Sequence, residues 1–292
     1  MHSYLRSVGF HNIKKKEMTG FLQEMMANPD YIEHALDTEG NEFAELRKEF
    51  TPGIGVALRG TYDEEDNFHM EYYYPYCQAG RISTESKVEL VKASDKESLL
   101  GICDDMKLGV DLIFFVQDMF QILISEQRNH KIVNFGGVKL AGLAYEGSVL
   151  LPVRTPEPQA QRTKKNVAKR KELIQAARDG DQKAIERLTL IDMDLYSNIT
   201  NRVEKEDILT IVNSYFMPSG IECDKYSVMG EIQGVARVKN DWTDETLYIL
   251  NIISNELEFD VCICAKDLLG EPEVGRRFKG RIWMQGNVTG YR

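Results

Sequence analysis

The chain has 292 residues, of which 42% are hydrophobic and 28% charged, with a net charge of −10. These values are typical of a folded globular protein long enough for two or three domains, and they exclude a disordered or fibrous chain. The longest apolar run, Leu112–Val116, is far shorter than the ~20 residues of a membrane span, and no apolar stretch follows Lys14–Lys16 to form a signal peptide. The sequence therefore predicts a cytoplasmic protein with no membrane partner.

The charge is unevenly distributed along the chain. Residues 1–153 contain 15 basic and 24 acidic residues, a net charge of −9, whereas residues 154–217 carry +2 and residues 218–292 carry −3. Neutralisation of phosphates dominates nucleic-acid binding. A protein this acidic is therefore not a general nucleic-acid coat protein.

Five cysteines occur at irregular spacing: Cys77, Cys103, Cys223, Cys262 and Cys264. An odd number in a large chain argues against a secreted disulfide framework and favours a reducing compartment. Zinc requires further ligands at suitable spacing, and no C-x-x-C or H-x-x-x-H pattern is present. We expect buried free thiols, no metal and no cofactor.

Residues 1–153 predict an α+β domain with an antiparallel sheet. Apolar residues at helical spacing predict a helix over Lys15–Ala27, which Pro29 ends. Alternation with a period of two predicts strands in the segments that follow. The expected elements are strands at 54–62, 68–76 and 81–91, a short helix at 96–106, a strand at 110–116, a helix at 118–126, and a hairpin of 139–145 with 148–153.

A proline-rich linker and a helical middle are expected next. Three prolines between Pro152 and Pro158 forbid a helix and favour an extended spacer, which places a linker at residues 154–161. Residues 162–217 read as helical, with Asp181 as an N-cap, one helix beginning near Ala184, and two more at 192–203 and 206–216. The first helix carries a run of cations without an acid: Arg162, Lys164, Lys165, Lys169, Arg170 and Lys171.

Residues 218–292 predict a small all-β domain. Alternating segments at 226–232, 257–263 and 278–284, with an apolar run at 247–253, indicate four or five antiparallel strands. That number of strands in about 70 residues suits a small barrel or an OB-like sheet. The whole chain is therefore expected to be a multi-domain α+β protein with a helical middle and a C-terminal barrel.

The final strand supplies the main candidate binding residues. Its even positions are apolar, whereas its odd positions are Arg277, Lys279, Arg281 and Trp283. A basic face with an aromatic residue suits a single-stranded nucleic acid or an anionic ligand. The alternative, which we favour, is a solvated face whose cations pair with nearby acids. The basic run that includes Lys164, Lys165, Lys169 and Arg170 has the same two interpretations, and solvated or intramolecular use is again favoured.

Three segments resemble a known family. They are Phe259–Gly286, Gly136–Leu143 and Met1–Phe10. Together they make nearly the whole chain similar to an uncharacterised bacterial family of comparable length, the domain-of-unknown-function family numbered 3881. Because that family has no established activity, the resemblance implies neither a reaction nor a catalytic residue.

No catalytic motif is evident in the sequence. G-x-S-x-G, the P-loop lysine motif and G-x-G-x-x-G before a helix are all missing. We therefore expect a non-enzymatic binding or adaptor protein whose partner is another protein. The alternatives are an enzyme with its site in a cleft between domains, and a nucleic-acid-binding protein that uses the basic helix and the last strand.

Overall fold

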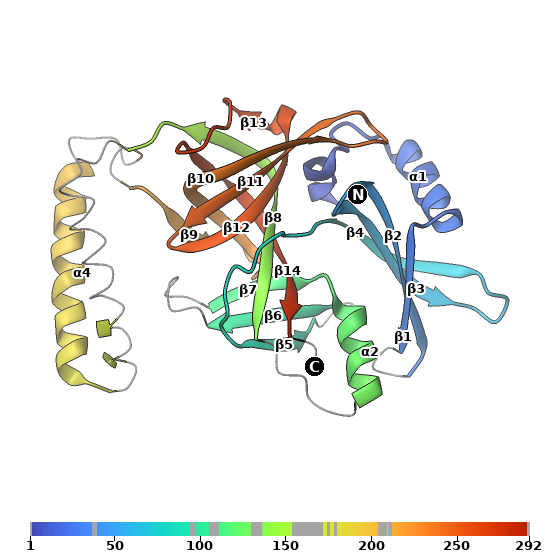
Figure 1. Ribbon diagram of the computed structural model, residues 1–292, viewed down its shortest axis with the longest axis horizontal. Helices are drawn as coiled ribbons and strands as arrows, with labels where there is room; N and C mark the ends of the chain where they lie inside the picture. The colour runs from blue at the N-terminus through green and yellow to red at the C-terminus, as the bar shows by residue number, and fades with distance from the viewer. Residues whose placement is uncertain are drawn as a thin grey trace.

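The computed structural model describes residues 2–36, 40–93, 97–104, 111–129, 136–153, 172–173, 176–177, 180–203, 209 and 212–290. Within these residues the protein is mostly β with few helices, arranged as two sheets, one of which closes into a barrel (Figure 1). The predicted α+β class is confirmed. No helix in the described part of the chain has the length and apolar character needed to span a membrane.

A four-stranded antiparallel sheet forms the first layer. Its order is β1-β2-β3-β4, and the strands are Tyr31–Leu36, Glu42–Thr51, Ile54–Tyr62 and Phe68–Cys77. The strands predicted at 54–62 and 68–76 are confirmed as β3 and β4, which pair antiparallel with Tyr62 opposite Phe68. The predicted helix is also confirmed, as α1 (Lys15–Ala27), which buries Met18, Phe21 and Met25.

The N-terminal segment is a 3-10 helix, η1 (Ser3–Val8), that packs against β4 and against two strands of the barrel. It ends at Gly9, whose φ of 101° is the left-handed conformation that glycine adopts without strain. The Asn240 side chain donates to the Val8 carbonyl at 2.7 Å, and a Cβ at residue 9 would lie only 2.8 Å from Asn240. Glycine is therefore required where η1 meets the barrel.

A closed five-stranded barrel forms the centre of the molecule (Figure 1). Its order is β8-β12-β11-β10-β14, and the pairing of β14 with β8 closes it. The barrel strands are β8 (Gly137–Leu150), β10 (Lys225–Lys239), β11 (Thr246–Ser254), β12 (Leu257–Cys264) and β14 (Arg277–Thr289). The predicted C-terminal barrel is therefore present, but one of its strands precedes the proline-rich linker.

Short strands extend this sheet, and two helices and a 3-10 turn complete the described elements. β14 pairs in parallel with β7, and β6 and β5 follow, while β9 joins β10 and β13 joins β8. These elements are β5 (Val88–Lys92), β6 (Leu99–Asp104), β7 (Asp111–Val116), β9 (Tyr215–Pro218), β13 (Leu268–Leu269), α2 (Met119–Asn129), α4 (Gln182–Val203) and the 3-10 turn η2 (Ala265–Asp267).

Two hydrophobic cores follow from the alternation of side chains along the barrel strands. Val261 and Ile263 lie in a core with Ile282 and Met284, whereas Cys262, Cys264 and Trp283 belong to a second core shared with η1, α1 and the first sheet. The even positions of β14 are thus buried, as predicted. Its odd positions do not form a uniformly wet face, because the first sheet and η1 cover part of it.

A buried ionic cluster links the first sheet to the segment before α2. Glu45 accepts from Arg59 Nε and from Arg47 Nε at 2.5 Å each, and from the Tyr74 hydroxyl at 2.7 Å. Arg47 Nη2 also donates to the Gln117 carbonyl at 2.7 Å. Burial opposes the charged carboxylate, but the two arginines hold the pKa of Glu45 below its usual value.

Two predicted elements before residue 110 are wrong. The segment expected to be a helix at 96–106 contains strand β6, because Leu100, Ile102 and Cys103 pair with β7 on one side and β5 on the other. The strand expected at 81–91 is shorter and belongs to the large sheet as β5, rather than to the sheet of β3 and β4. Pairing between neighbouring strands decides both segments, and the spacing of apolar residues within each segment does not reveal it.

The predicted hairpin at 139–145 and 148–153 is also wrong. β8 runs through Glu146 and Gly147 as one strand, with an irregularity of register opposite Arg281 and Ile282. A Cβ at residue 147 would lie 2.5 Å from the Phe278 ring. This glycine therefore allows a close approach inside the barrel and does not make a turn.

The middle of the chain differs in part from expectation. Asp181 accepts from the backbone of Lys183 and Ala184, which confirms it as an N-cap. α4 is one helix where two were expected, and the end of the helix expected at 206–216 is strand β9, which pairs with β10. The linker at 154–161 lies outside the described residues, so the division into domains stays a prediction.

Candidate functional site

An aromatic cleft lies between η1, strand β4 and the loop that leads into β10. Its volume is about 450 Å³, within the ~300–1,000 Å³ typical of ligand sites. We define the aromatic cleft by seven ring residues and three charged ones. They are His2, Tyr4, Tyr72, Tyr73, Tyr74, Phe115 and Trp283, with Glu222, Asp224 and Lys225.

The rings of the aromatic cleft are centred on Trp283. The ring centroid of Trp283 lies 4.9 Å from that of His2, 5.7 Å from that of Tyr4 and 5.2 Å from that of Phe115. The backbone N–H of His2 donates to the Tyr73 hydroxyl at 3.3 Å, which connects η1 to β4 across the cleft. Rings from four different segments therefore support one another in fixed positions.

Asp224 supplies a desolvated carboxylate beside these rings. Its Oδ2 accepts from Trp283 Nε1 at 2.7 Å, and its backbone carbonyl accepts from the N–H of Met284 at 2.9 Å. Burial raises the pKa of Asp224 above the usual value, although the bond from Trp283 and the charge of Lys225 act in the opposite direction. The cleft thus holds a negative charge that its own residues stabilise incompletely.

Lys225 and Glu222 form one wall of the aromatic cleft. Lys225 Nζ donates to Glu222 at 2.6 Å and lies 5.6 Å from the centroid of the Tyr4 ring. The ammonium therefore makes a cation–π contact with Tyr4. A second hollow of about 300 Å³ lies beyond this wall and shares these three residues, with Arg281 on its far side.

The four candidate residues on β14 are not brought together as a single face. Trp283 is 6% exposed and lies in the aromatic cleft, while Arg281 lines the second hollow and its Nε lies 3.7 Å from Glu146. Lys279 lines a third hollow with Asp267, and Arg281 borders that hollow as well, so these two cations are brought together. Arg277 is 7% exposed and donates to the carbonyls of three residues, Leu151, Leu209 and Val212.

The other candidate residues, Lys164, Lys165, Lys169 and Arg170, lie outside the described residues. The structure also places in the aromatic cleft residues that the sequence analysis did not name as candidates. Asp224 follows a loop with no recognisable motif, and Tyr72 and Tyr73 lie in an alternating strand segment. Tyr72 does pack, since its hydroxyl accepts from Arg59, but both rings also line the aromatic cleft.

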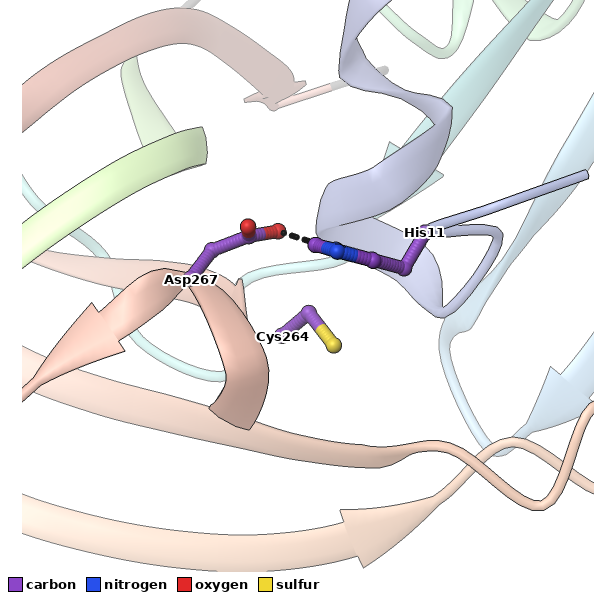
Figure 2. A group of neighbouring side chains, drawn as sticks. All are labelled: His11, Cys264 and Asp267. Carbon is purple, nitrogen blue, oxygen red and sulfur yellow. Dashed lines mark hydrogen bonds and ion pairs between the residues drawn. The ribbon is translucent and has the colours of Figure 1, made fainter.

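A second cluster of reactive side chains lies on the other side of η1. His11, Cys264 and Asp267 each offer a donor atom, and these atoms lie within 4.8 Å of one another. Figure 2 shows the three side chains gathered from separate segments, with the His11 ring directed at the Asp267 carboxylate. Among the described residues this is the one group of at least three such side chains close enough to share a metal ion.

The fold and these sites define an α+β protein built around a closed five-stranded barrel, with an aromatic cleft where the barrel meets the first sheet. Residues 5–286 match the family described as a domain of unknown function from an E. rectale gene, DUF3881. The chain belongs to this family, as the resemblance implied. Comparisons with curated proteins and with solved structures found no match.

Proposed function

We propose that the protein is a non-enzymatic binding protein whose aromatic cleft takes an organic cation, such as an alkylated ammonium group. The observation that carries the proposal is the desolvated Asp224 carboxylate beside the rings of Trp283 and Tyr4. Aromatic faces attract cations electrostatically, by about 0.5–2 kcal/mol each. A carboxylate in the same hollow adds a charge that a bound cation would neutralise.

The contact between Lys225 and Tyr4 supports this choice of ligand. An ammonium group already lies over one ring of the cleft, so this aromatic surface accepts a cation within the protein itself. The charged residues of the cleft, two carboxylates and one ammonium, sum to −1. Both features favour a positive ligand over an anion.

The alternative functions have less support from the same residues. A single-stranded nucleic acid would need accessible cations beside an aromatic ring, but Trp283 lies next to Asp224, and Arg277 is occupied by backbone carbonyls. An enzyme would need a second group positioned to act with Asp224. The nearest carboxylate, Glu222, is engaged by Lys225.

Binding of choline and of its uncharged isostere, 3,3-dimethyl-1-butanol, tests the proposal. The two compounds have the same shape, so any difference in affinity reports the charge. We expect choline to bind at least about tenfold more tightly, because a difference of ~1.4 kcal/mol is within the range of one cation–π contact. Equal affinities, or no binding of choline at millimolar concentration, would refute the proposal.

Tryptophan fluorescence provides a local readout for this titration. The chain has two tryptophans, and Trp242 is partly exposed and outside the aromatic cleft. Trp242→Phe leaves Trp283 as the sole tryptophan, so under tryptophan-selective excitation the ligand should still change the fluorescence of this variant. If the change disappears with Trp242 instead, the ligand binds elsewhere.

A further inference from the structure

The side chains of His11 and Asp267 meet at a single cationic group. Arg6 Nη2 contacts Asp267 Oδ1 and lies 3.2 Å from His11 Nδ1, and Arg6 Nε donates to Asp267 Oδ2 at 2.9 Å. His11 Nδ1 also lies 3.2 Å from Asp267 Oδ2. In one imidazole tautomer Nδ1 donates to Asp267, and in the other it accepts from Arg6 and has a lone pair that a metal ion can take.

This spacing is that of two ligands on one metal ion. Metal–nitrogen and metal–oxygen bonds of ~2.0–2.2 Å in a tetrahedral site place the two donor atoms about 3.3 Å apart. Cys264 Sγ lies within 4.8 Å of both donor atoms, so an imidazole, a thiol and one carboxylate surround one point. Glu245 lies beside the thiol, with its Oε2 3.8 Å from Cys264 Sγ.

The burial of the ligands and the access for an ion also suit a metal site. The Asp267 side chain is 3% exposed and Cys264 is buried, which shields the ligands from bulk water. A hollow of about 320 Å³ has His11, Glu245 and Glu17 on its lining, so an ion has a route to the cluster past two carboxylates. This hollow is distinct from the aromatic cleft.

We propose that His11, Cys264 and Asp267 form a binding site for a divalent transition metal ion, with zinc as the best chemical match and Glu245 as a neighbouring carboxylate. The mixed nitrogen, sulfur and oxygen ligands are those that zinc accepts. In the metal-free protein Arg6 holds the place of the ion, and Lys266 occupies Glu245 at 2.5 Å. Both cations have partly exposed side chains that can move toward solvent.

This proposal departs from the expectation of no metal. The sequence does not indicate the site because one of its ligands is far from the others along the chain. His11 is more than 250 residues from Cys264, so no short motif records the site. Two of its ligands lie at the end of one strand, with Cys264 as the last residue of β12 and Asp267 in η2, and Glu245 precedes the adjacent strand β11. η1 and Gly9 then bring His11 to the same point.

Titration with Co²⁺ tests the site on the full chain after treatment with a chelator. Cobalt replaces zinc and gives a near-ultraviolet charge-transfer band only when a thiolate binds it. We use a Cys223→Ser background, because this exposed thiol is a source of unspecific binding. The band is expected with this protein and with the control Cys262→Ser, and it is expected to be lost with Cys264→Ser.

Two further variants keep the test decisive if Cys264→Ser does not fold. His11→Gln is expected to weaken cobalt binding by at least about tenfold, since even outer partners of a metal ligand contribute that much. Arg6→Met is expected to strengthen it about two- to fivefold, the factor for removing a partly exposed ion-pair partner that competes with the metal.

Three results would contradict the proposed metal site. No charge-transfer band at millimolar Co²⁺ would refute the metal site. A band that survives Cys264→Ser, or weaker binding by Arg6→Met, would show that the ligands or the role of Arg6 are assigned incorrectly. None of these results depends on choline, so the metal site and the aromatic cleft are tested separately.

Discussion

Replacing Asp224 with asparagine should separate ligand affinity from stability. The asparagine Oδ1 can still accept from Trp283 Nε1, so the variant removes the charge and keeps the hydrogen bond. An interaction with a charged group contributes about 1.5–3 kcal/mol, compared with ~0.5–1.5 kcal/mol for a neutral one. We therefore expect choline affinity to fall about 10- to 100-fold, while the aromatic rings retain the remaining binding.

The stability of Asp224→Asn should change little or increase. Burial raises the pKa of Asp224 in the folded protein, so the folded state binds this proton more tightly than the unfolded state. The free energy of unfolding then decreases as the pH rises from the unfolded to the folded pKa. At neutral pH the charge is a cost that asparagine removes, and the weaker hydrogen bond offsets part of the gain, leaving a net change within about 1 kcal/mol.

Calorimetric titration and urea denaturation measure the two effects. Asp244→Asn is a matched control, because this carboxylate is exposed and its backbone has a φ of 59°, which asparagine tolerates. Choline affinity of the wild type should fall on acidification through the pKa of Asp224, and that of Asp224→Asn should lack this step. If affinity is unchanged while stability drops by several kcal/mol, Asp224 is structural and the ligand assignment is wrong.

Two further variants test the packing that supports the cleft. Glu45→Gln should destabilise the protein by about 3–5 kcal/mol in urea denaturation, because it leaves two buried arginines without their counter-charge. The control Glu42→Gln, at an exposed site, should change stability by less than about 0.5 kcal/mol. Similar effects of both variants would contradict the role of the ionic cluster. Trp283→Phe keeps a ring but removes the donor to Asp224, so it should raise the pKa of Asp224 further. Choline binding should then weaken more at mildly acidic pH than at neutral pH. An unchanged pH profile of choline affinity would show that the bond from Trp283 does not influence the charge of Asp224.

The strands that face a core on one side could be predicted from the sequence. Alternation along 257–263 and 278–284 reflects the barrel interior directly, and α1 follows from its apolar stripe and Pro29. The errors fall where strand pairing and packing override the local pattern of apolar residues. β6 contains Leu99–Asp104 because β5 and β7 flank it, and β8 passes straight through Gly147 because Phe278 needs the space.

The candidate site could be predicted only in its parts. Trp283 was identified as an aromatic residue next to cations, but its neighbours in space are Asp224, Phe115 and His2, which are separated from it by 59 residues or more. Neither a carboxylate after a cysteine nor a histidine near the start of the chain has a local signal. Barrel closure and the docking of η1 create these contacts, and both depend on long-range packing.

The docking of η1 also connects the two proposed sites. Tyr4 faces the aromatic cleft, whereas Arg6, two residues later, binds Asp267 on the side of the metal cluster. Both sites are therefore complete only when this segment is packed against β4, β8 and β12. A ligand that binds only the docked form stabilises it by mass action. A metal ion that replaced Arg6 at Asp267 would remove one contact that holds η1, so η1 would then rest more on the ring contacts of Tyr4 with Trp283 and Tyr145.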